Sequence, residues 1–226
     1  METRFQQELN QLKEHLLHMA GLAERAISNA IDALVKRDTQ LAEKTISEDE
    51  QINKMELIID EWCLRLLALH QPLAADLRFI TSAMRINTEL ERIGDLSVNI
   101  AERVMSLNQE PQLKPYIDIP RMAEITKEML KDVLDSFVKG DAQLARFVCE
   151  RDDQVDALND QVFRELLTYM ISDPKTITRA VHLIIVSRCL ERIADHTTNI
   201  AEGVIFMVKA LVIKHHADAK PKEEKK

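Results

Sequence analysis

A pair of acidic side chains recurs at the same spacing in the two halves of the chain, as Glu91 with Asp95 and as Glu191 with Asp195. Residues four apart in an α-helix lie on the same face, one above the other, so each pair would present two neighbouring carboxylates. Like charges at this spacing repel by roughly 0.2–0.5 kcal/mol on an exposed helix. A cation that prefers oxygen ligands would turn this repulsion into attraction. The spacing therefore suggests a carboxylate metal site in each half.

The acidic pairs belong to a segment that is retained in two copies. Residues 90–102 are identical to residues 190–202 at nine of thirteen positions, whereas the nine residues that precede each segment share none. A solvated acidic helix face, with Arg92 and Arg192 as local counter-ions, is the alternative interpretation of a single copy. Retention of the acids in both copies, while their flanks diverged, favours a functional site.

A second acidic pattern precedes each of these segments. Residues 49–53 align with residues 152–156, and the second half offers Asp152 and Asp156 four positions apart. The first half offers Asp49 with Asn53, which is a weaker set of ligands. An ordinary acidic patch on a helix face explains the pattern equally well.

Two isolated residues could extend these sites. His196 follows Asp195 and could add a nitrogen ligand, although a lone histidine is more often a partly buried polar residue. Asp76 lies near the start of an expected helix, where the helix dipole favours an acid, and we interpret it as such. His215 and His216 lie in a charged C-terminal tail that we expect to be solvated rather than metal-binding.

Helices are the elements that must position these acids. Apolar residues recur every three or four positions over nearly the whole chain, which predicts long amphipathic helices. We expect a break at residues 36–38, where Asp38 would cap the next helix, and a third helix that starts at Pro72 and ends near Leu107. Its apolar face is expected to hold Leu77, Ile80, Met84, Ile86, Leu90, Ile93, Ser97, Ile100 and Val104.

The same plan then restarts. Residues 35–42 match residues 138–145 at six of eight positions, and helices would follow again, with the last one opening at Pro174 and ending near Ile213. The repeating unit is about 100 residues with three helices, and short connections make neighbouring helices antiparallel. The sequence therefore predicts an all-α protein of two tandem antiparallel three-helix bundles. Their expected bounds are residues 1–107 and 121–213, with a proline-containing linker at 108–120 and a disordered charged tail at 214–226.

The composition restricts the class of partner. The net charge of −8 argues against nucleic acid, which binds basic surfaces. The N-terminus does not resemble a signal peptide, and the late apolar stretch 204–213 is too short to span a bilayer. Three cysteines, an odd number without a Cys-x-x-Cys motif, fit buried thiols in a reducing compartment. We therefore expect a cytoplasmic protein that meets membranes only through partners.

Enzyme motifs are missing from the sequence. It contains no Gly-x-x-x-x-Gly-Lys loop, no Gly-x-Ser-x-Gly elbow and no His-Glu-x-x-His. Ferritin-like di-iron sites use Glu-x-x-His, and none of the seven histidines has a glutamate three residues earlier. A non-catalytic adaptor is the favoured interpretation. A carboxylate-bridged metal enzyme and a metal buffer remain the alternatives.

Four segments resemble the phosphate-transport accessory protein family, PhoU: residues 71–78 (QPLAADLR), 89–95 (ELERIGD), 170–174 (MISDP) and 190–196 (LERIADH). The resemblance extends over residues 5–213 and includes the duplication. It implies two tandem three-helix bundles and a regulator of phosphate uptake that is not an enzyme. It also implies coupling of a phosphate ABC transporter, through its ATPase subunit, to a sensor histidine kinase, so that phosphate-starvation genes stay silent when phosphate is plentiful.

The resemblance also implies a metal. Some members of the family hold iron or zinc clusters at such acidic motifs, and oxygen-rich sites of this kind admit Mg or Mn as well. Asn53 departs from the acidic pattern, which makes the first site the weaker one. A homodimer is plausible, but the repeat does not establish it. The ligands carried over by the resemblance are Glu91, Asp95, Glu191, Asp195, Asp49, Asp152 and Asp156.

Overall fold

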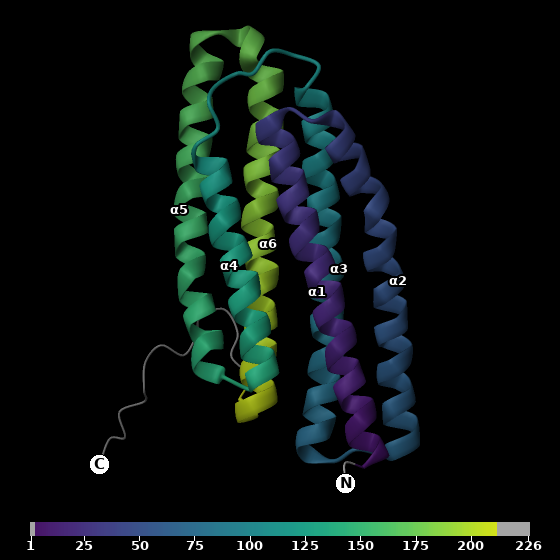
Figure 1. Ribbon diagram of the computed structural model, residues 1–226. Helices are drawn as coiled ribbons and strands as arrows, with labels where there is room; N and C mark the ends of the chain where they lie inside the picture. Colours follow the sequence, from purple (N-terminus) through teal and green to yellow (C-terminus); the bar gives the residue numbers. More distant parts are fainter. Residues whose placement is uncertain (1–2, 212–226) are drawn as a thin grey trace, which may run out of the picture.

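The computed structural model describes residues 3–211, and these form six long α-helices without strands (Figure 1). The predicted all-α fold is confirmed. The expected tail at 214–226, with its two histidines, lies outside the described residues. The elements are α1 (Arg4–Lys36), α2 (Thr39–His70), α3 (Ala74–Leu107), α4 (Asp118–Lys139), α5 (Ala142–Ser172), a 3-10 turn η1 (Pro174–Thr176) and α6 (Ile177–Lys209).

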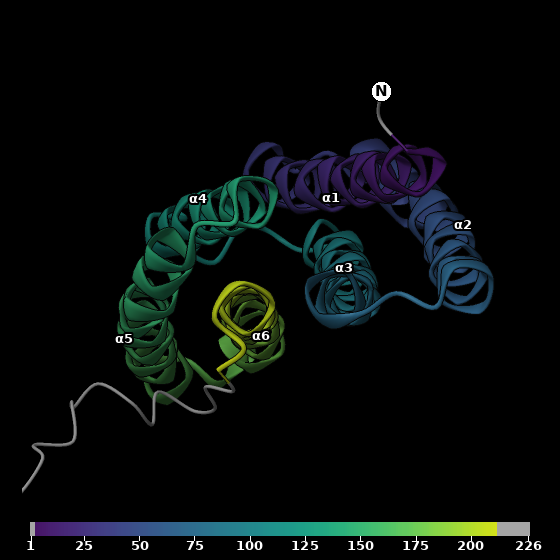
Figure 2. The same cartoon turned by 90° about the horizontal axis from the view of Figure 1, so that it is seen from below.

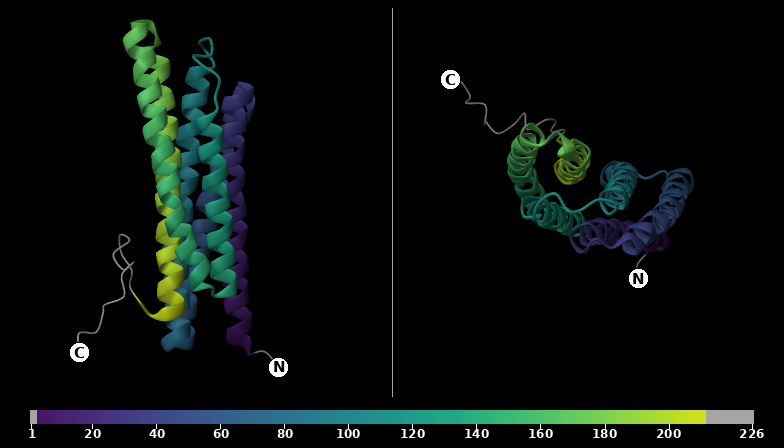
Figure 3. Two further views of the ribbon diagram at one scale, coloured as in Figure 1. Left: turned by 90° about the vertical axis from the view of Figure 1, so that its left-hand side faces the viewer. Right: turned by 90° about the horizontal axis from the view of Figure 1, so that it is seen from above.

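The helices form two antiparallel three-helix bundles, α1–α3 and α4–α6, which pack side by side. Contacts between the bundles run along α3 with α6 and along α1 with α4. Seen along the helix axes, α2, α1, α4 and α5 form a curved outer layer, and α3 and α6 lie together on its inner side (Figure 2). The side view shows that all six helices follow one long axis (Figure 3). This arrangement places the repeated acidic segments of α3 and α6 on the two inner helices.

Local chemistry explains several helix ends. The side chain of Asp38 accepts a hydrogen bond from the amide of Leu41 at 3.0 Å, which confirms the predicted cap. Asp141 does the same at the start of α5. Gly140 closes α4 with φ +65°, a left-handed conformation that glycine adopts without strain.

The structure corrects three predictions at helix starts. Pro72 does not open α3, because Leu73 is the extended residue before the helix and α3 begins at Ala74. Pro174 opens a 3-10 turn rather than α6 itself, and α6 begins three residues later. Leu77, expected in the core, lies in the first turn of α3 and is 40% exposed.

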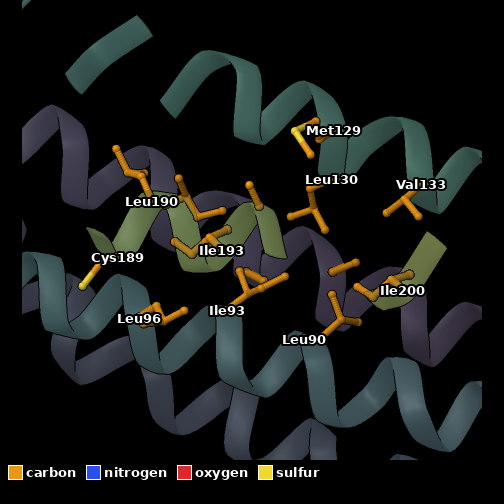
Figure 4. Packing of buried hydrophobic residues seen from close by; sticks show 14 of the residues in the cluster. Leu90, Ile93, Leu96, Met129, Leu130, Val133, Cys189, Leu190, Ile193 and Ile200 are labelled. Atoms are coloured by element: carbon orange, nitrogen blue, oxygen red, sulfur yellow. The ribbon is translucent and has the colours of Figure 1, made fainter. Parts of the chain in front are cut away.

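The two bundles share one hydrophobic core. Leu90 and Ile93 of α3 and Leu190 and Ile193 of α6 are fully buried, and they meet where the inner helices face each other and α4 (Figure 4). The repeated Leu-Glu-Arg-Ile segment thus has two structural roles. Its apolar residues join the bundles, while its acids lie near acids of α2 and α5.

The three thiols are largely buried, as the sequence predicts. Cys63 and Cys189 are buried and Cys149 is half-buried, and all three are free. Burial raises the pKa of Cys63 to about 12 and that of Cys149 to about 11, so both are unreactive thiols at neutral pH. Among the described helices, none combines the length and the apolar character needed to cross a membrane.

Candidate functional site

The first acidic cluster lies at the seam between α2 and α3. Asp49 of α2 lies near both acids of α3, because Asp95 acts electrostatically on Asp49 and Asp49 acts on Glu91. Burial and then the charge of Asp95 raise the pKa of Glu91. Burial also raises the pKa of Asp49, with a further increase from Asp95 and an opposing hydrogen bond from Asn53. A carboxylate whose charge raises the pKa of a neighbouring carboxyl lies close enough to repel it.

Glu56 is a member of this cluster that the sequence analysis missed. Burial, Asp60 and Asp95 raise its pKa, and Arg92 lowers it. Glu56 lies seven residues after Asp49, which is two helical turns on the same face of α2. This spacing could have identified Glu56 from the sequence. The aligned residue of the second repeat is Asn159, so the acid is absent there and a comparison of the repeats hides it.

Neutral side chains orient the acids of the first cluster. The amide of Asn53 donates to Asp49 Oδ2 at 3.1 Å, so Asn53 positions Asp49 rather than acting as a missing acid. The other oxygen, Asp49 Oδ1, is buried and has no hydrogen-bond partner among residues 3–211. Asn87, fully buried, donates to Asp60 Oδ1 at 2.9 Å and to the Glu56 carbonyl oxygen at 3.0 Å. The sequence alone did not identify Asn87 as part of the cluster.

A close approach of the two helices explains one difference between the repeats. A Cβ atom at Gly94 would lie 3.0 Å from Asp49 Oδ1 and 2.9 Å from Ile52 Cδ1, closer than such atoms approach. A larger residue at this position would therefore require the ends of the Asp49 and Ile52 side chains to shift. The equivalent position in α6 is Ala194.

The second cluster occupies the matching seam between α5 and α6. Burial, Asp195 and Asp156 raise the pKa of Glu191, while Arg188 and Arg192 lower it. Burial raises the pKa of Asp195 against the lowering effect of His196 and Arg192. Asp156 and Glu191 line an open pocket of about 290 Å³ together with Ala157, Asn159 and Asp160.

Asp152 lies one turn before Asp156 and is only 6% exposed. Its charge and that of Glu202 both raise the pKa of Cys149 after the larger effect of burial. Glu202 therefore approaches the same stretch of α5. It matches Glu102 in the repeat but was not predicted as a site residue.

His196 joins the two bundles. Its Nδ1 lies 2.6 Å from Glu89 Oε2 of α3, and Asn199 donates to the same oxygen at 3.2 Å. The suggested role of an extra metal ligand thus competes with a hydrogen bond between the inner helices. Asp76 lies in the first turn of α3, as expected from the helix dipole.

The donor set fits a hard or borderline cation. Each seam gathers carboxylates that are partly desolvated and mutually repelling, and the first retains a buried oxygen without a hydrogen-bond partner. Across residues 3–211, no three His, Cys, Asp or Glu side chains already stand in ligand geometry. An ion would therefore bind by drawing side chains together. The residues that could hold it are Asp49, Glu56, Glu91 and Asp95 in the first seam and Asp152, Asp156, Glu191 and Asp195 in the second.

The repulsion predicts a pH dependence of stability. A carboxyl whose pKa is higher in the folded than in the unfolded chain stabilises the fold when protonated, and this contribution is lost as pH rises through the folded pKa. For Glu91 it is complete below the ordinary value of 4.5. Glu91→Gln with Asp95→Asn should therefore be more stable than the wild type at pH 7 without metal, and the difference should shrink as pH falls to 4.5.

Urea unfolding in chelator-containing buffers measures this difference. Comparison of variant with wild type is essential, because burial lowers the pKa of His182, which removes stability on acidification in both proteins. The hydrogen bond from His70 lowers the pKa of Glu8, and that contribution is lost only below 4.5. A stability difference that stays constant from pH 7 to 4.5 would contradict repulsion at the first seam.

Comparison with known proteins identifies the family. A family model described as the PhoU domain matches the chain twice, at residues 16–104 and 119–204. The chain is 46% identical over 208 residues to a phosphate-specific transport system accessory protein PhoU homolog of Aquifex aeolicus, covering 92% of this chain and 94% of that one. A homolog of the same description from Pseudomonas putida is 41% identical over 213 residues, covering 94% and 83%.

Solved structures agree with the sequence relatives. The crystal structure of PhoU from Pseudomonas aeruginosa superposes with a TM-score of 0.89 at 41% identity and covers 92% of this chain and all of that one. The phosphate transport system regulatory protein PhoU from Streptococcus pneumoniae gives 0.88 at 30% identity, covering 94% of this chain and 100% of that one. With two matched repeats, relatives above 40% identity over nearly full length and the same six-helix fold, the chain belongs to the PhoU family.

Proposed function

We propose that this protein is a non-catalytic regulator of phosphate uptake. The observation that carries the proposal is the near-complete match to relatives named accessory proteins of a phosphate-specific transport system. In this proposal the protein works in the cytoplasm, as a homodimer, and couples the ATPase subunit of a phosphate ABC transporter to a sensor histidine kinase. It meets the membrane only through these partners.

The outer helices support a role in binding proteins. Leu64 of α2 and Leu167 of α5 occupy equivalent positions in the two repeats and are 59% and 42% exposed. Leu57, on the same face of α2, is 69% exposed, and Phe163, one turn before Leu167, is 47% exposed. Exposed apolar side chains grouped on a surface often mark contacts with other proteins. Each repeat thus offers an outer face on which a partner could dock.

The carboxylate seams support metal binding as a second part of the proposal. A bound iron or zinc ion, with Mg or Mn as further candidates, would supply positive charge that neutralises the acids. Glu91 and Asp95 would hold it from α3 while Asp49 and Glu56 approach from α2. Gly94 lets α2 come close, and the amide of Asn53 fixes Asp49. These residues position the helices of a bundle relative to one another, which stabilises the faces that partners would recognise.

Affinity purification from phosphate-replete and phosphate-starved cells tests the regulatory function. The full chain should retain both the transporter ATPase subunit and the sensor kinase, identified by mass spectrometry. Leu64→Glu and Leu167→Glu should each weaken recovery of a partner. Leu17→Glu, which places the same charge at a 40% exposed position on α1, is the matched control. Recovery of neither partner from either culture would contradict the proposal.

A further inference from the structure

The linker between the repeats crosses the end of α3 and the start of α6 (Figure 1). Cationic side chains contact it there. Arg37 Nη2 donates to the carbonyl oxygens of Asn108 at 3.0 Å and Leu107 at 3.4 Å. Arg179 Nη1 of α6 donates to the carbonyl oxygen of Pro111 at 2.9 Å. Two arginines from different repeats therefore hold the linker in place.

Buried nitrogen atoms without a hydrogen-bond partner lie beside this linker. Arg103 Nε, Arg179 Nε and His182 Nδ1 are buried and make no hydrogen bond within residues 3–211. Arg179 Nε lies 3.3 Å from Glu110 Oε2 but is not aligned with it for a hydrogen bond. Buried polar groups normally have hydrogen-bond partners, and three nitrogen atoms without one lie at this one place.

These residues face one another across the end of the inter-repeat interface. Arg103 of α3 and Glu110 of the linker both act on His182 of α6, and burial together with Arg103 lowers the pKa of that imidazole. The ring is therefore neutral at neutral pH. Two carboxylates also face the group: Glu110 beside Arg179, with 46% of its side chain exposed, and Glu102 at 3.5 Å from Arg103, with 48% exposed. Both acids lie at the rim, whereas the unpartnered nitrogen atoms lie inside.

We propose that Arg103, Arg179 and His182 form a binding site for inorganic phosphate at the junction of the two repeats. Guanidinium groups present parallel N–H donors that match the oxygens of a tetrahedral anion, and the neutral imidazole adds a further N–H donor. The site rests on the proposed function, because it would let a phosphate regulator contact the ion itself. An ion bound here would touch α3, α6 and the linker, and so would couple phosphate to the relative position of the repeats.

Glu110 gives the site a means of selecting phosphate over sulfate. Phosphate retains a proton near neutral pH and can donate it to a carboxylate, whereas sulfate has no proton and would be repelled. A binding group left without its partner penalises the analogue that lacks the matching donor. The site should therefore bind phosphate more tightly than sulfate, and Glu110→Gln should reduce that preference.

Isothermal titration calorimetry of the full chain with inorganic phosphate and with sulfate, in phosphate-free buffer containing EDTA, tests the proposal. Arg103→Gln removes charge-assisted hydrogen bonds, so phosphate binding should weaken at least about tenfold. Arg103 makes no hydrogen bond to the linker, so this variant should leave the linker anchored. Arg85→Gln, an exposed position on the same helix, should bind as the wild type does.

Glu91→Gln with Asp95→Asn should also retain phosphate binding, which separates this site from the metal seams. Absence of phosphate binding, or equal affinity in the wild type and Arg103→Gln, would overturn the site. If Arg103→Gln fails to fold, Glu110→Gln tests the site independently. An unchanged preference for phosphate over sulfate in Glu110→Gln would also overturn the proposal. Partner capture without phosphate binding would refute the site alone, whereas phosphate binding without partner capture would refute the regulatory function alone.

Discussion

Glu91→Gln combined with Asp95→Asn is expected to stabilise the metal-free protein at pH 7 and to abolish the stabilisation that iron or zinc gives at the first seam. The wild-type acids repel each other and Glu56 in a partly buried position. A cation held by all of them reverses this effect. An ion at one hundred times its dissociation constant stabilises a folded protein by about 2.7 kcal/mol, and the variant should lose that gain.

Thermal and urea unfolding with and without added metal measure both effects. The same change in the second seam, Glu191→Gln with Asp195→Asn, should remove a separate increment of metal-dependent stability. The wild type should therefore respond more strongly than either double variant, and the quadruple variant should not respond. Metal-dependent stabilisation that persists in the quadruple variant would show that the ion binds elsewhere.

The chain contains its own control for the spacing. Glu128 and Asp132 of α4 are also a Glu-x-x-x-Asp pair, but both are bound by Arg151, which lies 3.0 Å from Asp132 Oδ2. The Arg151 side chain is only 13% exposed, so removal of its partners leaves a buried charge uncompensated. Glu128→Gln with Asp132→Asn should therefore destabilise the protein and leave its metal response unchanged. Glu91→Gln with Asp95→Asn should do the opposite on both counts.

Leu190→Ala should lower the free energy of unfolding by about 2–5 kcal/mol, because the side chain is fully buried between the bundles. Leu90→Ala, its counterpart in the first repeat, should cost a similar amount. Since both residues belong to one core shared by α3, α4 and α6 (Figure 4), each substitution should shift a single cooperative transition. Leu64→Ala, at an exposed position, should change stability by no more than about 0.5 kcal/mol.

Calorimetry and circular dichroism distinguish a shared core from independent bundles. If the core is shared, all probes report one common midpoint for each protein, and this midpoint is lower in both variants than in the wild type. Two transitions, of which only one responds to Leu190→Ala, would contradict the shared core and would make each repeat a separate folding unit.

The sequence was sufficient for the helices but not for all of their starts. Apolar periodicity and the duplication depend on local spacing, so six helices and two bundles follow from them. Pro72 and Pro174 misled because proline suits the first turn of a helix but also suits the turns before it. Leu77 has the correct period, yet its exposure depends on where neighbouring helices end, which spacing does not reveal.

The candidate site was predictable in part for a similar reason. Glu91 and Asp95 stand out because a second copy of the segment exists, and Asp49 follows from the aligned pattern in α2. Glu56 and Asn87 act across the seam between two helices, so their proximity to the acids appears only in the folded chain. Glu128 and Asp132 have the same spacing but are neutralised by Arg151 of α5. This is a tertiary contact, so the spacing alone does not separate them from the candidate site.

Elemental analysis of purified protein tests most directly whether the repeated carboxylates are cation sites. Wild-type protein, exchanged into metal-free buffer after loading with iron or zinc, should retain metal. Glu91→Gln with Asp95→Asn and Glu191→Gln with Asp195→Asn should each retain less, and the quadruple variant should retain none, while Glu128→Gln with Asp132→Asn should match the wild type. Equal metal content in the wild type and the quadruple variant would contradict the account.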